Sequence, residues 1–146
     1  PYTVPRGAYR CSDGRWVGIS ASSDSVAGRV MHILGVGDDE RFATFDGRTK
    51  HRDELERLMT EWCAVRPQDE VLKVFEDAEA AIGPILDMAD IARDPHYLAR
   101  QAIVNVGDTP MQNLIAKLSK TPGVLRHEGR AKDADGAAIR SKGWDQ

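Results

Sequence analysis

The alternation of apolar and polar positions near the start of the chain predicts a β-hairpin. Tyr9 and Cys11 alternate with small or polar neighbours, and an apolar pattern resumes over residues 16–19. Between these segments, Asp13 and Gly14 offer the positive backbone dihedrals that tight hairpin turns require. We therefore expect Asp13 to form the turn and not to act in catalysis.

Apolar residues at three- and four-residue steps predict three helices after the hairpin. The first covers about 26–34, with caps offered by residues 20–25 and an end at Gly35. The second covers 51–65, and Pro67 opens a third that ends near residue 80. These helices each present one apolar face, so we expect them to pack against the hairpin.

Residues 41–48 are expected to form a loop. Phe42 and Phe45 would anchor it, and the Asp-Gly pair at 46–47 would turn it. Arg41 and Arg48 flank these anchors, and a guanidinium commonly fixes loops by donating to carboxylates or carbonyl oxygens. We therefore interpret both arginines as structural.

The second half of the chain has shorter and weaker patterns. Gly83 and Pro84 interrupt an apolar run at 81–86, which indicates an edge strand. Asp87 and the pair Asp94-Pro95 each open a brief helix, and the β-branched run 103–106 predicts a strand. A last strand is expected around 114–118, followed by a turn at 121–123 and a polar tail.

Composition and charge exclude several classes of protein. The chain has 146 residues, a net charge of −3 and a pI near 5.8. It shows no basic face for nucleic acid and no apolar run long enough to span a membrane. We expect a soluble, cytoplasmic protein whose two cysteines, Cys11 and Cys63, are reduced and buried.

The residues alone identify no active centre. The four histidines fall in separate predicted elements, without partners at metal-ligand spacing, so no metal site is expected. No serine or cysteine stands in a recognisable nucleophile motif. The residues by themselves therefore support only an α+β fold, with a small antiparallel sheet and several flanking helices.

Five motifs in order give a more specific indication. They read RGAYRCSDGRWVGIS, ERFATFDGR, HRDELERLMTEW, IGP and ARDPHYLAR, and they lie within residues 6–101. This set resembles the C-terminal part of family III CoA transferases, the CaiB/BaiF group that includes formyl-CoA transferases and α-methylacyl-CoA racemases. The motif residues that we interpret as structural are Asp13, Gly14, Trp16, Arg41, Phe42, Arg48, Gly83 and Pro84.

The resemblance implies a domain organisation and a reaction. Residues 1–106 would form the small α+β domain, and 107–146 a return segment that packs on a large Rossmann-like domain of an interlocked homodimer. Members move CoA, their co-substrate, between acyl-CoA thioesters and carboxylic acids. The nucleophilic aspartate lies in the large domain, before Pro1, so no catalytic residue is assigned here and this fragment alone is expected to be inactive. Val4, Pro5 and Arg6 are the residues expected to touch substrate.

Two alternatives remain at this stage. The chain begins without Met, which suggests a fragment or a processed product. It could therefore be a non-catalytic interaction domain derived from the family. Relatives on the same fold also racemise or isomerise acyl-CoA thioesters, and residues outside this chain would decide between those reactions and transfer.

Overall fold

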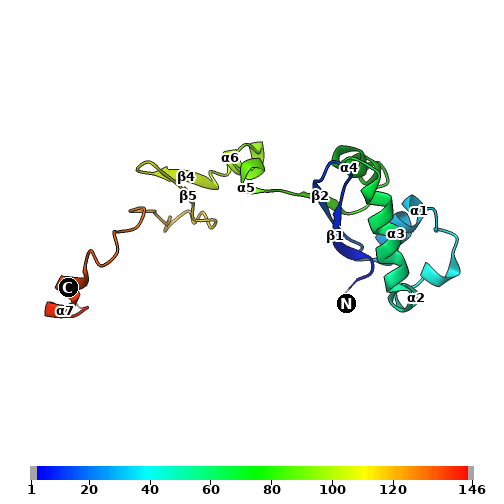
Figure 1. The fold of residues 1–146 in the computed structure, drawn as a ribbon, viewed down its shortest axis with the longest axis horizontal. Coiled ribbons are helices and arrows are strands. Elements are labelled where there is room, and N and C mark those ends of the chain that lie inside the picture. Colours follow the sequence, from blue (N-terminus) through cyan, green and yellow to red (C-terminus); the bar gives the residue numbers. More distant parts are fainter. Residues whose placement is uncertain (1–2, 145–146) are drawn as a thin grey trace. The chain divides into compact units, whose positions relative to one another are not determined.

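The computed structural model describes residues 3–144, which belong to two compact units (Figure 1). Unit 1 is Pro1–Leu86 and unit 2 is Asp87–Gln146. The contacts thus divide after Leu86, whereas the family resemblance placed a domain boundary after Val106. That boundary concerns packing on a domain outside this chain, and it stays a prediction.

Unit 1 contains an antiparallel sheet of three strands in the order β1-β2-β3. The strands are β1 (Arg6–Arg10), β2 (Trp16–Ser20) and β3 (Ile82–Ile85). The predicted hairpin and the strand at 81–86 are therefore confirmed. Pro84, which cannot donate to a strand ladder, lies in β3 at the edge of the sheet.

The hairpin turn is formed as the Asp-Gly pair predicts. Gly14 has a φ of 82°, and the Asp13 carboxylate accepts a hydrogen bond from the Arg15 backbone N–H at 3.0 Å. The same carboxylate also accepts one from the backbone N–H of Gln68 at 2.9 Å. This second contact, which the sequence pattern did not predict, connects the turn to the start of a helix 55 residues away.

Three helices, as predicted, cover one face of this sheet (Figure 1). They are α1 (Asp24–Ile33), α3 (Arg52–Ala64) and α4 (Gln68–Asp77). Pro67 stands just before α4 instead of at its first position, and Gly35 follows α1 with a φ of 75°. The buried core between helices and sheet includes Tyr9, Val17, Ile19, Val30, Leu55, Met59, Val71 and Phe75.

The expectation of a loop at 41–48 is wrong for most of that segment. A 3₁₀ turn, η1, covers Glu40–Phe42, and a short helix, α2, covers Phe45–Lys50. Thr44 caps α2 by accepting from the Gly47 N–H at 3.2 Å, so the Asp-Gly pair lies inside a helix. Phe42 is buried as expected, but Phe45 is exposed and anchors nothing.

The side chain of Arg48 is buried and joins three separate segments. Its guanidinium donates to the carbonyl oxygens of Val4 at 2.9 Å and Phe42 at 3.1 Å, and to the Asp24 carboxylate at 2.6 Å. Because buried carbonyl groups need partners, this one side chain satisfies groups that solvent cannot reach. Arg48 thus fastens the residues before β1 to η1 and to α1.

Unit 2 consists of short elements. They are α5 (Met88–Ile91), α6 (Pro95–Ala99), β4 (Ile103–Val106), β5 (Thr109–Gln112) and α7 (Gly136–Lys142). The two brief helices and the strand at 103–106 are confirmed. The strand expected at 114–118 is wrong, because β4 pairs through a two-residue turn with residues 109–112. Helix α7 was not predicted from the polar tail.

Replacement of Arg48 tests its structural contribution. Arg48→Met leaves the carbonyls of Val4, Phe42 and Ala43 without this donor, so we expect the free energy of unfolding to fall by about 3 kcal/mol. The control Arg57→Met removes only an exposed pair with Glu61 on α3, and should cost less than about 0.5 kcal/mol. Urea unfolding followed by circular dichroism measures both, and equal losses would contradict this role for Arg48.

Two glycines in helices should respond to alanine with opposite signs. A Cβ on Gly47 would lie 2.3 Å from the Arg41 carbonyl oxygen, so Gly47→Ala should destabilise unit 1 by about 1–3 kcal/mol. A Cβ on Gly28 meets nothing within 4 Å, so Gly28→Ala in α1 should stabilise by about 0.5–1 kcal/mol. Thermal melts of both variants check this, and stabilisation by Gly47→Ala would refute the steric argument.

Candidate functional site

A shallow groove of about 440 Å³ lies on unit 1 where the three strands begin or end near Arg6. Arg6 and Gly7 of β1, residues 18–20 of β2, and Ala81 and Ile82 beside β3 line it. Arg6, Gly18 and Ser20 of this lining occupy the strand positions that alternate with the core residues Tyr9, Val17 and Ile19, so the groove opens on the face of the sheet opposite the helices. We refer to this side as the open face.

Small side chains shape the open face. In the strand register, Ala8 lies opposite Gly18, and Gly18 lies opposite Gly83. These three positions carry at most a methyl group. The surface of the sheet is therefore depressed there, between the larger side chains of Trp16 and Ile85 at one end and Arg6 at the other. Gly18, the middle residue of this row, lines the groove, so small residue size contributes to its shape.

The backbone before Arg6 is held in place on both sides. The Val4 carbonyl accepts from Arg48, and the Pro5 carbonyl accepts from the Ala21 N–H at 3.1 Å. Val4 and Pro5 are themselves buried, so their side chains do not reach the surface of unit 1. Of the three residues expected to touch substrate, only Arg6 is exposed, and the expectation for Val4 and Pro5 finds no support in this packing.

The other motif residues lie away from the groove, apart from Gly83, which adjoins it. Asp13 and Gly14 form the turn at the far end of the hairpin, and Trp16 stands beside that turn, 44% exposed. Pro84 lies opposite Val17 in β3. The motifs therefore do not converge on one place.

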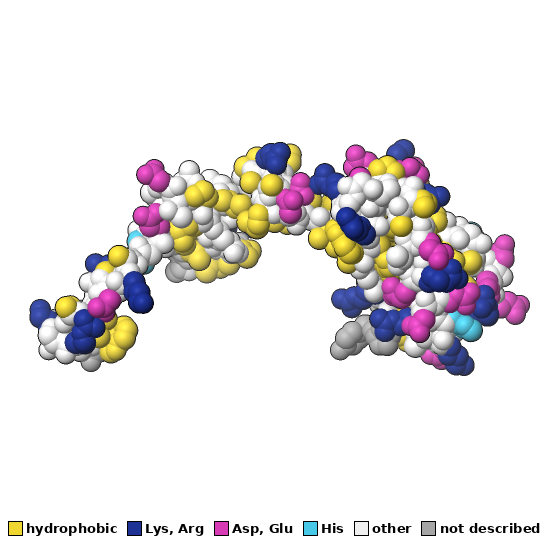
Figure 2. Space-filling model, in the orientation of Figure 1, with side chains coloured by type: hydrophobic (Ala, Val, Ile, Leu, Met, Phe, Trp, Pro, Cys, Tyr) yellow, Lys and Arg dark blue, Asp and Glu magenta, His cyan; other side chains and the backbone are white. Residues whose placement is uncertain are grey.

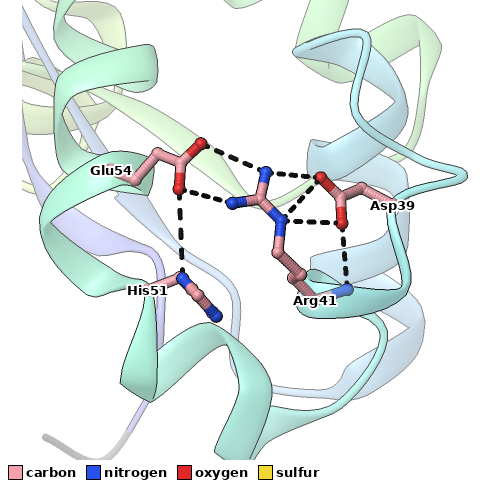
Figure 3. A network of polar contacts seen from close by, with 4 residues as sticks. All are labelled: Asp39, Arg41, His51 and Glu54. Atoms are coloured by element: carbon pink, nitrogen blue, oxygen red, sulfur yellow. Dashed lines mark hydrogen bonds and ion pairs between the residues drawn. The ribbon is translucent and has the colours of Figure 1, made fainter.

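Arg41 is the centre of an ionic network on the surface of unit 1 (Figure 3). Its guanidinium lies 2.7 Å from the Asp39 carboxylate and 2.9 Å from Glu54 of α3, and His51 lies 3.9 Å from Glu54. Hydrogen bonds from Arg41 hold the pKa of Asp39 below its usual value. All four groups are paired with one another, so the network fastens η1 to α3 and leaves no free nucleophile or base.

Tyr9 and the two cysteines lie in the core of unit 1. The Tyr9 hydroxyl donates to Glu56 at 2.9 Å, and burial, followed by the effect of Glu56, raises the pKa of this phenol. Both cysteines are free and buried, as the sequence predicted. Burial raises the pKa of Cys63 to about 12 and also raises that of Cys11. Neither thiol is ionised at neutral pH, which argues against a cysteine nucleophile.

The residues that the structure describes contain neither a metal-binding cluster nor a membrane-spanning helix. No group of three or more His, Cys, Asp or Glu side chains among residues 3–144 could hold a metal ion. Within the same residues, no helix is long and apolar enough to cross a bilayer.

Unit 2 carries a second, larger groove of about 470 Å³. Apolar side chains from α5, β4 and β5 dominate it. Its polar members are His96, Tyr97 and Arg100, from α6 and its end, and Gln112 of β5. Hydrophobic side chains gather on the surface of this unit (Figure 2). The most exposed large ones in this unit are Met88, Leu98, Ile115, Leu118, Val124 and Trp144.

Sequence reasoning missed both grooves. The signal for the first was available, because Ala8 and Gly18 occupy the outward positions of two predicted strands, but the partner of β3 was unknown. The second depends on β5, which contains Pro110 and lacks the β-branched pattern that marks a strand.

Comparison with known sequences covers nearly the whole chain. The sequence profile of CoA-transferase family III matches residues 1–129. A succinyl-CoA–D-citramalate CoA-transferase of Chloroflexus aurantiacus is 32% identical over 139 residues, 90% of this chain and 35% of that protein. An acetyl-CoA:oxalate CoA-transferase of Acetobacter aceti is 26% identical over 146 residues, 97% of this chain and 37% of that protein. The chain thus spans about a third of the length of these relatives.

Comparison with solved structures gives the same family. A CaiB/BaiF family protein of Brucella suis superposes with a TM-score of 0.73 at 28% identity, covering 97% of this chain and 38% of that one. The matched chain has the α+β fold class expected from the sequence. Because the family profile matches 129 of 146 residues and the fold agrees, this chain belongs to CoA-transferase family III.

Proposed function

We propose that this chain is the small domain and return segment of an enzyme that moves CoA between carboxylic acids. The match of the family profile over residues 1–129 carries this proposal. Relatives named as CoA-transferases support it, although the chain spans only about a third of each. The other part of the enzyme would hold CoA and the nucleophile.

The chemistry in this proposal is covalent catalysis by an aspartate outside residues 1–146. The carboxylate would attack the thioester carbonyl and release CoA thiolate, leaving an acyl anhydride. CoA would then attack the aspartyl carbonyl, release the first acid and leave an aspartyl thioester. The second acid would attack this thioester and release CoA, which gives a new anhydride. CoA would finally attack the acyl carbonyl of that anhydride, which releases the second acyl-CoA and the free aspartate. Splitting the exchange in this way replaces one difficult step by several easier ones.

The carboxylates of unit 1 support placing the nucleophile elsewhere. Asp13 accepts backbone hydrogen bonds in a turn, Asp24 pairs with Arg48, and Glu56 accepts from Tyr9. Asp39 and Glu54 share Arg41. Each of these groups is committed to holding the fold, and none of them lines the groove at Arg6.

The apolar surface of unit 2 supports the role of a return segment. Soluble proteins seldom leave a large continuous apolar surface uncovered. We propose that residues 107–146 pack on the large domain of an interlocked homodimer, as the family resemblance implies, and that the groove of unit 2 is covered there. Acyl-CoA substrates are cytoplasmic metabolites, so we place the enzyme in the cytoplasm.

The whole protein should exchange CoA between a donor thioester and a free acid. We expect at least one pair in a broad panel of acyl-CoA donors and acids to react, with a mass increase on one aspartate in the trapped intermediate. If the protein racemises or isomerises the thioester without exchanging CoA, the proposed transferase activity is wrong and the enzyme is a racemase or isomerase. No reaction and no adduct across the panel would refute the proposal in favour of an interaction domain.

Residues 1–146 alone should bind CoA negligibly and show no turnover. The physical reason is that the nucleophile and the principal CoA contacts lie outside these residues in the proposal. Isothermal titration calorimetry with CoA measures this directly. Micromolar binding by residues 1–146 would show that this part carries a CoA site of its own.

A further inference from the structure

We propose that Arg6 binds the free carboxylate of the acyl group, and that the enzyme therefore acts on acids with a second carboxylate. This inference rests on the proposed transferase function and adds the substrate class and a specificity-determining residue. Three features support it: the groove on the open face of unit 1, the positive charge of that face, and an Arg6 side chain that forms no hydrogen bond or ion pair with residues 3–144.

Arg6 is the one charged residue that lines the groove. Within residues 3–144, no hydrogen bond or ion pair engages its side chain, whereas Arg41 and Arg48 are each held by carboxylates. An exposed guanidinium has five N–H donors in a planar fork. Arg6 therefore presents donors that the described residues of unit 1 do not use.

The open face is positively charged within an acidic protein. The chain has 23 acidic and 20 basic residues, but the outward positions of the three strands include two arginines and no carboxylate. Those positions are Arg6, Ala8, Arg10, Trp16, Gly18, Ser20, Gly83 and Ile85. A local excess of positive charge favours an anion on this face.

The groove fits a single carboxylate on a short carbon chain better than the several phosphates of CoA. Arg10 is four residues further along β1, about 13 Å away by strand geometry, so only one guanidinium serves the groove. One guanidinium matches one carboxylate in a two-point hydrogen bond. Beside it, Gly18 and Ile19 offer backbone surface and the exposed Ala81 offers a methyl group for the methylene groups of the acid.

The backbone at Arg6 is also held in position before a ligand arrives. Arg48 and the Ala21 N–H fix the carbonyls of Val4 and Pro5, and β1 pairs Arg6 with Ser20. A side chain on such a rigid strand loses little backbone freedom when it binds. Because the fixed backbone limits how far the guanidinium can reach, Arg6 would distinguish acids by the placement of their second carboxylate.

The test compares two acyl groups of equal chain length in the whole protein. Succinyl-CoA ends in a carboxylate, and butyryl-CoA ends in a methyl group. Each is assayed for exchange with its own isotopically labelled acid, so that no other acid enters the reaction. The variants are Arg6→Gln, Arg6→Lys and the matched control Arg10→Gln, which removes the same charge from the same strand outside the groove. Thermal melts verify that each variant folds.

We expect Arg6→Gln to lower kcat/KM for succinyl-CoA by about tenfold to a hundredfold and to change that for butyryl-CoA by less than about threefold. Arg6→Lys should fall between, because it keeps the charge and loses the fork. Arg10→Gln should leave both substrates within about threefold of the wild type, since it lies outside the groove.

Several results would overturn the inference while leaving the transferase function intact. One is an equal loss of kcat/KM for both acyl-CoA substrates in Arg6→Gln, which would place Arg6 on CoA. Others are no loss of kcat/KM for either substrate, or equal effects of Arg6→Gln and Arg10→Gln. A wild-type protein that exchanges butyryl-CoA but not succinyl-CoA would also overturn it. Absence of exchange for every acyl-CoA in the wild type would instead refute the proposed function itself.

Discussion

The buried guanidinium of Arg48 is the interaction on which the geometry of unit 1 depends most. It gathers the carbonyl of Val4, the carbonyl of Phe42 and the carboxylate of Asp24 around one side chain. A buried cation is costly unless it is fully hydrogen-bonded, and three segments distant in sequence meet that requirement together. Arg48 thereby defines where β1 begins, and so where the first exposed residue of that strand, Arg6, stands.

The open face shows how local residue size becomes a feature of the surface. Ala8, Gly18 and Gly83 lie in one row across the three strands. Because their side chains are small, the surface of the sheet is depressed beside Arg6. The opposite face has the reverse character, because Tyr9, Val17 and Ile19 fill the space under the helices. One face of the sheet packs against the helices, while the other carries the groove.

The strong local patterns predicted much of this fold and little of the candidate site. Asp13-Gly14 identified the hairpin, and the apolar spacing of α3 identified that helix, because both signals act within a few residues. The Asp-Gly pair at 46–47 was misread, because the Thr44 cap and the close approach of the Arg41 carbonyl to Gly47 decide its conformation. Strand β5 was missed because Pro110 breaks the usual pattern. The groove depends on strand register, which no local signal contains.

Membership of CoA-transferase family III and the chemistry of the described residues lead to one account. Asp13, Asp24, Asp39, Glu54 and Glu56 of unit 1 accept hydrogen bonds or form ion pairs that stabilise the fold, so the proposed catalysis relies on an aspartate elsewhere. Among the described residues of unit 1, the exposed Arg6 guanidinium forms no hydrogen bond or ion pair, and we propose that it binds the substrate carboxylate. In this account the small domain selects the acid, and the remainder of the enzyme performs the transfer.

A crystal structure of the whole protein with succinyl-CoA bound would test this account most directly. The account predicts that the succinyl carboxylate lies in the groove of unit 1, with two Arg6 nitrogens about 2.7–2.9 Å from its oxygens. A succinyl carboxylate bound by other residues, or an Arg6 side chain covered by another part of the protein, would contradict it.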